Sequence, residues 1–72
     1  MNPKMKILRK KEMSLPLLPG VYIMKNADGE IIYIGKAKAL KNRVSQYFGS
    51  QNRHPVKVLK MVENVDRFDY IV

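Results

Sequence analysis

Residues 20–35, GVYIMKNADGEIIYIG, decide the fold of this chain. The segment holds two short runs rich in β-branched and aromatic residues, 20–25 and 30–35, and the sequence NADG lies between them. Asp-Gly between two such runs is a strong signal of a β-hairpin. The sequence therefore predicts an antiparallel pair of strands.

The facing of the two tyrosines in these strands follows from parity, because side chains alternate along a strand. A two-residue Asp-Gly loop places Tyr22 opposite Gly35, and a four-residue loop places it opposite Tyr33. In both registers Tyr22 and Tyr33 share a face, and only a loop of odd length would separate them. The other face is wholly apolar and is predicted to be the core face. Its residues are Val21, Ile23, Ile32 and Ile34.

Two helices and a third strand are predicted after the hairpin. The first helix spans about residues 37–48, and the second follows Pro55, which suits a first helical turn. Each helix has one apolar stripe, formed by Leu40, Val44, Tyr47 and Phe48 in the first and by Val58, Met61, Val62 and Val65 in the second. Residues 66–72 form the last strand, with Phe68, Tyr70 and Val72 on one face. This order predicts a small α+β domain with a three-stranded antiparallel sheet flanked by helices.

The N-terminal part is predicted to contribute little to the core. Residues 1–14 form a basic arm or a short helix, with weak helical spacing at Met5, Leu8 and Met13. Two prolines in the SLPLLPG segment that follows favour an extended chain there. A chain of 72 residues forms one domain at most, and we expect residues 15–72 to be its core.

The charge of the chain is strongly unbalanced. Fourteen Lys and Arg residues oppose six Asp and Glu residues, which gives a net charge of +8. Residues 31–62 contain no acid, and their basic residues are Lys36, Lys38, Lys41, Arg43, Arg53, Lys57 and Lys60. Because like charges this close together repel, a polyanionic partner such as nucleic acid is favoured. The alternative is a solvated basic face that only keeps the protein soluble.

Composition excludes several other classes of protein. The chain has no cysteine, so it has neither a disulfide nor a thiolate metal site. No apolar run approaches the roughly 20 residues of a membrane span. The basic N-terminus is not followed by the apolar region of a secretory signal. We therefore expect a cytoplasmic protein without a membrane partner.

The hairpin and the first helix carry groups that suit a phosphate. Tyr22 and Tyr33 share a face beside Gly35, and a glycine at a strand end often marks the close approach of a ligand. Lys36 follows at once, and Arg43 lies on the flank of the first helix. An arginine offers a bidentate fork to phosphate oxygens, and a phenol donates a hydrogen bond to phosphate or, at a lowered pKa, accepts a proton from water. The alternative is that the two tyrosines are a half-buried packing pair.

The same segment resembles the signature of the GIY-YIG nuclease family. GVY at 20–22 stands for GIY, YIG at 33–35 matches, and KAK, LKNRV and YF follow at the spacing of the family. The resemblance covers about residues 15–72 and implies the GIY-YIG fold. Within the family it is greatest to the N-terminal endonuclease domain of the incision subunits of bacterial nucleotide excision repair. Valine in place of isoleucine at position 21 is a conservative departure.

The resemblance implies a reaction and a role for each matching residue. In this family one divalent cation, Mg²⁺ or Mn²⁺, and a water molecule cut a DNA phosphodiester. Tyr33 would activate the water, and Tyr22 would hold the neighbouring network of water and phosphate. Lys36 and Arg43 would bind and polarise the scissile phosphate. The two residues expected to keep the backbone clear of the phosphate are Gly20 and Gly35.

The resemblance also implies the partners. The substrate would be damaged double-stranded DNA, cut 3′ to a lesion, and other regions of such a protein would bind a UvrB-type helicase subunit. The residues expected to contact DNA outside the catalytic set are Lys38, Lys41, Arg53 and Lys57. Two alternatives stay open, a stand-alone small nuclease of another branch of the family and a DNA-binding module without catalysis.

The metal ligand of the family has no match among these residues. The family ligand is a glutamate on a helix after the third strand, and we expect it beyond Val72. Glu63 precedes that strand and is expected to face solvent, and His54 is interpreted as a cap or surface residue. The acids of the turn and of the last strand do not match either: Asp28, Glu30, Asp66 and Asp69. The 72-residue chain is therefore expected to be a truncated core that folds but does not cut DNA alone.

Overall fold

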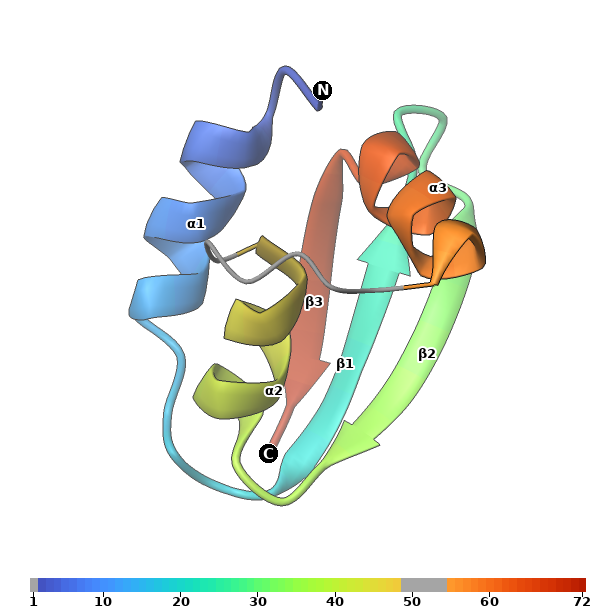
Figure 1. Cartoon of the computed structure of the whole chain (residues 1–72). Helices are drawn as coiled ribbons and strands as arrows, with labels where there is room; N and C mark the ends of the chain where they lie inside the picture. Colours follow the sequence, from blue (N-terminus) through green and yellow to red (C-terminus); the bar gives the residue numbers. More distant parts are fainter. Residues whose placement is uncertain (1, 49–54) are drawn as a thin grey trace.

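The computed structural model describes residues 2–48 and 55–72. Its elements follow the chain in the order α1, Met5–Met13; β1, Gly20–Lys25; β2, Ile31–Ala37; α2, Leu40–Phe48; α3, Val56–Asn64; and β3, Arg67–Ile71. The strands form one antiparallel sheet in the order β2-β1-β3 (Figure 1). The predicted α+β class and three-stranded antiparallel sheet are confirmed. None of the described helices is long and apolar enough to span a membrane.

The molecule has two layers, the sheet and the helices that cover one face of it. α1 packs against α2, and α2 packs against β1 and β2. Lys11 of α1 contacts Phe68 of β3, and α3 lies beside the β1–β2 hairpin (Figure 1). A single apolar core fills the space between the layers. It consists of Leu8, Leu15, Tyr22, Met24, Ala37, Leu40, Val44, Phe48, Val62, Val65 and Phe68.

The buried face of the sheet is the opposite of the predicted one. Tyr22 and Met24 of β1 are 2% and 0% exposed, whereas Ile34 of β2 is 56% exposed. The prediction of a core face made of Val21, Ile23, Ile32 and Ile34 is therefore wrong for the face as a whole, and of these four only Ile32 packs, partly buried, against the core. Parity groups the residues of a strand correctly, but it does not reveal which face the helices cover. Both faces of this hairpin carry apolar side chains, so their composition could not decide between them.

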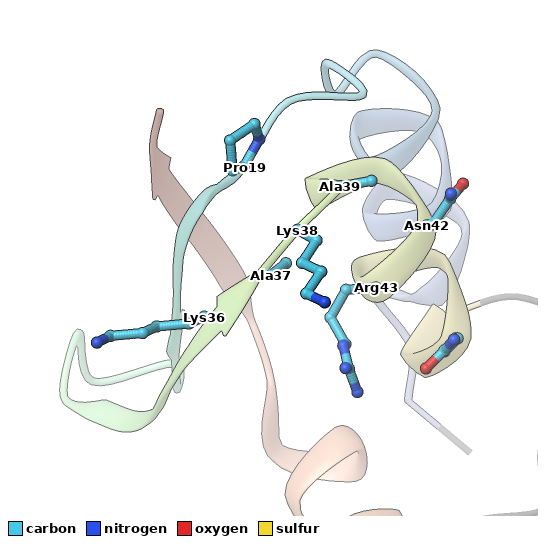
Figure 2. A pocket seen from close by; sticks show the side chains of 8 residues that line it. Pro19, Lys36, Ala37, Lys38, Ala39, Asn42 and Arg43 are labelled. Atoms are coloured by element: carbon cyan, nitrogen blue, oxygen red, sulfur yellow. The ribbon is translucent and has the colours of Figure 1, made fainter.

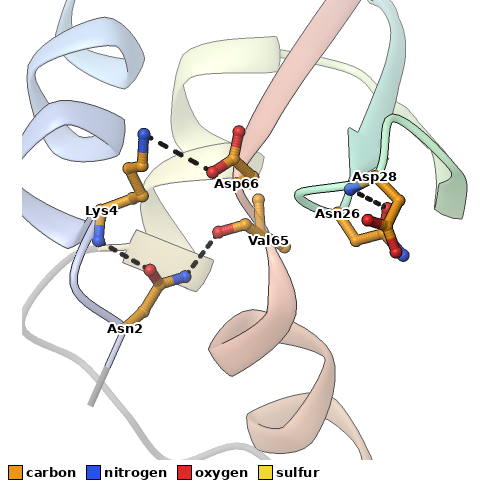
Figure 3. Close-up of polar contacts among 6 residues, drawn as sticks. All are labelled: Asn2, Lys4, Asn26, Asp28, Val65 and Asp66. Atoms are coloured by element: carbon orange, nitrogen blue, oxygen red, sulfur yellow. Dashed lines mark hydrogen bonds and ion pairs between the residues drawn. The ribbon is translucent and has the colours of Figure 1, made fainter.

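The hairpin closes through a loop of three residues, a length that was not predicted. The amide of Asn26 donates a hydrogen bond to the carbonyl of Glu30 at 3.0 Å, and the amide of Gly29 donates to the carbonyl of Asn26 at 3.0 Å. Gly29 has a φ of 82°, a left-handed conformation that glycine adopts without strain. The side-chain oxygen of Asn26 also accepts a hydrogen bond from the amide of Asp28 at 3.0 Å (Figure 3).

A bulge in β2 compensates for the odd length of the loop. The register shifts by one residue between Met24 and Lys25 of β1, which leaves Ile32 of β2 as the extra residue. Beyond the bulge Tyr22 lies opposite Gly35, the register predicted for a two-residue loop. Because the two shifts cancel, the tyrosines of β1 and β2 share a face as predicted.

The N-terminal helix belongs to the core, contrary to the expectation for this segment. Leu8 of α1 is 1% exposed. Before the helix, the side-chain amide of the buried Asn2 donates a hydrogen bond to the carbonyl of Val65 at 2.6 Å, and the ammonium of Lys4 lies 3.6 Å from the carboxylate of Asp66 (Figure 3). These contacts tie the start of the chain to the junction between α3 and β3.

α2 begins at Leu40, later than the expected Ala37, because β2 continues to Ala37. The first amides of a helix have no partner within it. Here the amide of Leu40 donates to the carbonyl of Leu18 at 2.9 Å, and the amide of Lys41 donates to the carbonyl of Pro16 at 3.2 Å. The proline-containing segment thus fixes the start of the helix that carries the candidate arginine.

Candidate active site

Three tyrosines from three different elements meet beside the core. Tyr22 of β1, Tyr33 of β2 and Tyr47 of α2 have ring centroids 5.7 to 6.4 Å apart, and we call them the tyrosine cluster. The hydroxyls of Tyr22 and Tyr47 are hydrogen-bonded at 2.9 Å. The predicted proximity of Tyr22 and Tyr33 is confirmed. The cluster is a set of phenols held in fixed orientation by a strand pair and a helix.

Sequence reasoning missed Tyr47, which it assigned only to the apolar stripe of the helix. A signal was present, because Arg43 and Tyr47 are four residues apart and so lie on the same side of α2. Buried tyrosine hydroxyls also need a hydrogen-bond partner, and the Tyr22 hydroxyl meets that need here. Tyr47 therefore brings the helix and its arginine to the phenols of the sheet.

The two candidate glycines are next to protein atoms rather than to an open space for a phosphate. A Cβ atom built on Gly35 would overlap the Cζ and hydroxyl of Tyr22. A Cβ atom on Gly20 would overlap the carbonyl oxygen of Ile71 and lie 2.8 Å from Cδ1 of Leu40. The absence of a side chain at Gly35 lets the Tyr22 ring cross the neighbouring strand, and at Gly20 it lets the ends of β1 and β3 approach.

Burial raises the pKa of Tyr22 far above its ordinary value of 10.0, and the hydrogen bond with Tyr47 raises it further. Burial also raises the pKa of Tyr47, although the hydrogen bond with Tyr22 and the nearby guanidinium of Arg43 act in the opposite direction. Both phenols are therefore neutral near pH 7 and can donate hydrogen bonds. Tyr33 is 42% exposed and is the member of the cluster that solvent reaches most easily.

A basic cavity of about 660 Å³ lies between the end of β2 and the start of α2. The described residues of its lining include three cations and no acid: Pro19, Lys36, Ala37, Lys38, Ala39, Asn42, Arg43 and Gln46. The side chains of Lys38 and Arg43 reach into the same space (Figure 2). Lys38 and Arg43 form no ion pair with another residue in the described ranges 2–48 and 55–72. The cavity therefore presents positive charge that an anion can neutralise.

Lys36 lies apart from the tyrosines with which it was grouped. It pairs with Val21 across the sheet and so points to the face opposite that of Gly35 and Tyr33. In Figure 2 its side chain extends away from Arg43. Lys36 thus borders the basic cavity at its edge, while Arg43 is the candidate cation on the side of the cluster.

The residues expected to contact DNA come from different elements. Lys38 lines the basic cavity, and Lys41 is half-buried on the first turn of α2. Lys57 of α3 lines a second cavity that also touches Tyr33 and Tyr47. The remaining candidate, Arg53, lies outside the described residues, as does His54.

The described residues do not form a complete metal site. Neither cavity lining includes a carboxylate. Glu63 is exposed near the end of α3, as expected, and Asp69 forms an ion pair with Lys25 at 2.8 Å on the other face of the sheet. The hydrogen bond from Lys25 holds the pKa of Asp69 below its ordinary range. No group of three His, Cys, Asp or Glu side chains able to hold a metal occurs within residues 2–48 and 55–72. The residues present therefore do not fit a divalent cation by themselves.

The antiparallel sheet, with one tyrosine on the GVY strand and one on the YIG strand, defines the GIY-YIG class of domains. The model of the UvrC-like GIY-YIG domain matches residues 18–72, and the chain belongs to this family. The resemblance seen in the sequence is thereby confirmed.

Individual relatives are closely similar over the length of this chain. The UvrABC system protein C of Clostridium acetobutylicum is 61% identical over 59 residues, which are 82% of this chain and 10% of that protein. The crystal structure of the GIY-YIG N-terminal endonuclease domain of UvrC from Thermotoga maritima, bound to its catalytic magnesium ion, has a TM-score of 0.76 and 44% identity, over 100% of this chain and 73% of that one. A variant of that domain with one tyrosine changed to phenylalanine, also bound to the catalytic cation, has a TM-score of 0.76 and 43% identity over the same shares. The chain spans about a tenth of the length of the curated relatives that it matches.

Proposed function

We propose that this chain is the catalytic core of a DNA endonuclease that serves as an incision subunit of nucleotide excision repair. The observation that carries the proposal is the tyrosine cluster with Arg43 one helical turn from Tyr47, in a chain of the UvrC-like family. The reaction is hydrolysis of a phosphodiester bond 3′ to a lesion in double-stranded DNA. The divalent cation is Mg²⁺ or Mn²⁺.

Each member of the site has a role that its environment supports. Tyr33 is the exposed phenol, and we assign it to the activation of the attacking water. Tyr22 and Tyr47 stay neutral because burial raises the pKa of both. One of their two hydroxyl protons makes the hydrogen bond between them, and the other is available to a water or phosphate oxygen beside Tyr33. Arg43 offers its bidentate fork to the phosphate and stabilises the charge that develops there. Lys36 borders the basic cavity, so it contributes positive charge near the phosphate and does not contact the phenols directly.

The metal-binding carboxylate of this proposal lies outside the 72 residues. The Thermotoga maritima domain extends beyond the part that this chain covers, and that domain binds its cation. A hard divalent cation needs carboxylate or other oxygen ligands, and it would supply polarisation of the phosphate and a lower pKa for bound water. The residues of this chain provide the phenols and the guanidinium that orient the water and the phosphate.

The basic surface supports sequence-independent binding to DNA. Lys38 and Arg43 line the basic cavity and Lys57 lines the cavity beside Tyr33, and none of the three forms an ion pair within the described residues. Phosphate contacts of this kind set affinity and position but do not read bases. We further propose that the whole protein works in the cytoplasm with a UvrB-type helicase subunit, which other regions of the protein bind.

A chimera tests the proposal. Residues 1–72 are joined to the part of the Thermotoga maritima domain that follows the matched region, and the chimera is incubated with lesion-bearing or nicked duplex and Mg²⁺ or Mn²⁺. We expect the chimera to cut in a metal-dependent way and the 72-residue chain to bind DNA without cutting it. Comparable cleavage by the short chain would show that one of its own acids, such as Glu63 or Asp69, serves as the ligand.

A folded chimera that binds DNA but does not cut it would favour a DNA-binding module without catalysis. That alternative is supported by the lack of a carboxylate among the described residues that line the two cavities. Cleavage of undamaged duplex without any need for a repair complex would instead favour a stand-alone nuclease of another branch.

A further inference from the structure

A second cavity, of about 370 Å³, borders the tyrosine cluster, and we call it the α3 cavity. Three elements contribute to its lining, which consists of Ile32, Tyr33, Tyr47, Lys57, Val58 and Met61. Among the described residues, the walls are two aromatic rings and three aliphatic or thioether side chains, with one exposed ammonium group and no acid. Such a mixture of apolar walls and few polar groups is typical of small-ligand sites.

The bulge in β2 shapes this cavity. Neighbouring residues of a regular strand point to opposite faces, yet Ile32 and Tyr33 both line the α3 cavity. Ile32 is the extra residue of the bulge, and bulges commonly re-aim a side chain next to a functional site. The same irregularity therefore keeps the tyrosines on one face and turns an isoleucine toward α3.

We propose that the α3 cavity receives the nucleoside attached to the phosphate that the tyrosine cluster and Arg43 hold. The inference rests on the proposed function. Tyr33 and Tyr47 belong both to the cluster and to the lining of the cavity. A phosphate held at their hydroxyls has a deoxyribose attached to it and a base one sugar away. The chain of a nucleic acid at the cluster must therefore pass the mouth of the cavity.

The chemistry of the lining suits a nucleoside of any sequence. The faces of a base pack favourably on aromatic rings and against the polarisable thioether of a methionine such as Met61. Lys57 is exposed at the cavity and can neutralise a neighbouring phosphate of the same strand. Among the described residues, the lining contains no amide or carboxylate side chain to read a base edge, so these residues hold the base by its shape.

The test is an NMR titration of the 72-residue chain with isotope-labelled methyl groups. The probes are thymidine 5′-monophosphate, thymidine 3′-monophosphate and inorganic phosphate. We expect at least one of the nucleotides to shift the methyl signals of Ile32, Val58 and Met61. We also expect that nucleotide to bind at least about fivefold more tightly than inorganic phosphate, because packing of a base on aromatic groups adds to the phosphate contacts.

Two variants of α3 make the test specific. Val58→Phe fills the cavity and is expected to remove the advantage of the nucleotide over phosphate, while phosphate binding stays within about twofold. Leu59→Phe is the matched control, since Leu59 is on the same helix, is 38% exposed and does not line the cavity. If Val58→Phe does not fold, as judged by its remaining methyl signals, Met61→Ala takes its place with the same expectation.

The outcomes separate this inference from the proposed function. If the nucleotides shift only signals around Arg43 and bind no better than phosphate, the α3 cavity is not a nucleoside site, while the phosphate site of the proposed function stands. The same holds if Val58→Phe and Leu59→Phe bind the nucleotide equally well. If neither nucleotides nor phosphate bind, both proposals are contradicted.

Discussion

Tyr22 lies directly across the β1–β2 ladder from Gly35, and its phenol occupies the space that a side chain at position 35 would need. From this place the Tyr22 hydroxyl reaches the hydroxyl of Tyr47 at 2.9 Å. The glycine of the YIG motif therefore serves the geometry of the tyrosine cluster. It permits the contact that connects the hairpin to α2.

Replacing Gly35 by alanine is expected to displace Tyr22 and lower the free energy of unfolding by about 1–3 kcal/mol, the usual cost of overpacking. Urea denaturation measures the loss. The same change in a Tyr22→Leu background is expected to cost clearly less, because the shorter side chain leaves room for the new methyl group. Equal costs in the two backgrounds would show that the overlap with Tyr22 is not the cause.

Stability is expected to fall steeply above about pH 10, and the buried phenols are the reason. Burial raises the pKa of Tyr22 and Tyr47 in the folded state above the ordinary 10.0. Their contribution is therefore fully present below the pKa of the unfolded state and is lost as pH rises through the folded-state values. Urea denaturation from pH 8 to 11 should show a shallower decline for Tyr22→Phe than for the wild type. A decline as steep in Tyr22→Phe as in the wild type would contradict the role of this buried phenol.

The hairpin could be predicted from the sequence, but the way in which its register arises could not. Asp-Gly between two strand-like runs identified the hairpin, and the register of Tyr22 opposite Gly35 was among the two expected. A loop of three residues and a bulge at Ile32 each shift the register by one, and their effects cancel. A bulge depends on how the strands twist and pack, so no short sequence pattern reveals it.

The tyrosines and the arginine of the site could also be predicted, whereas their surroundings could not. The motif resemblance pointed to Tyr22, Tyr33 and Arg43. It left out Tyr47, because a tyrosine in an apolar helical stripe has the same pattern as a core residue. The buried face of the sheet was assigned wrongly, since only the docking of the helices decides which of two apolar faces becomes the core.

The structure places α1 in the core, and two adjacent residues test this. Leu8 is 1% exposed and Ile7 is 63% exposed. Leu8→Ala is expected to lower the free energy of unfolding by about 2–5 kcal/mol, as is usual for a leucine removed from a core. Ile7→Ala is expected to change it by no more than about 0.5 kcal/mol. Similar effects of the two changes in chemical denaturation would mean that α1 does not pack as described.

DNA binding by the 72-residue chain is expected to be weak, independent of sequence and strongly dependent on salt. If about four phosphates are neutralised, the logarithm of the binding constant should fall against the logarithm of the salt concentration with a slope of about −3 to −4. Fluorescence anisotropy with a labelled duplex measures the slope. Lys38→Ala should make it shallower by about one. Lys25→Ala, which removes a cation paired with Asp69 on the other face, should leave it nearly unchanged. Binding without salt dependence contradicts the electrostatic account.

The most direct test of the account is the incision rate of the chimera when single members of the site are changed. Tyr33→Phe keeps the ring and removes the hydroxyl, and Arg43→Ala removes the guanidinium. Each is expected to lower the rate at least about a hundredfold while the fold is retained. Tyr70→Phe is the matched control, because Tyr70 is 40% exposed, close to the 42% of Tyr33, and lines neither cavity. A control rate near that of the wild type, with both site variants slowed, is the result predicted here. If Tyr33→Phe and Arg43→Ala cut as fast as the wild type, the tyrosine cluster is a packing feature and the proposed mechanism is wrong.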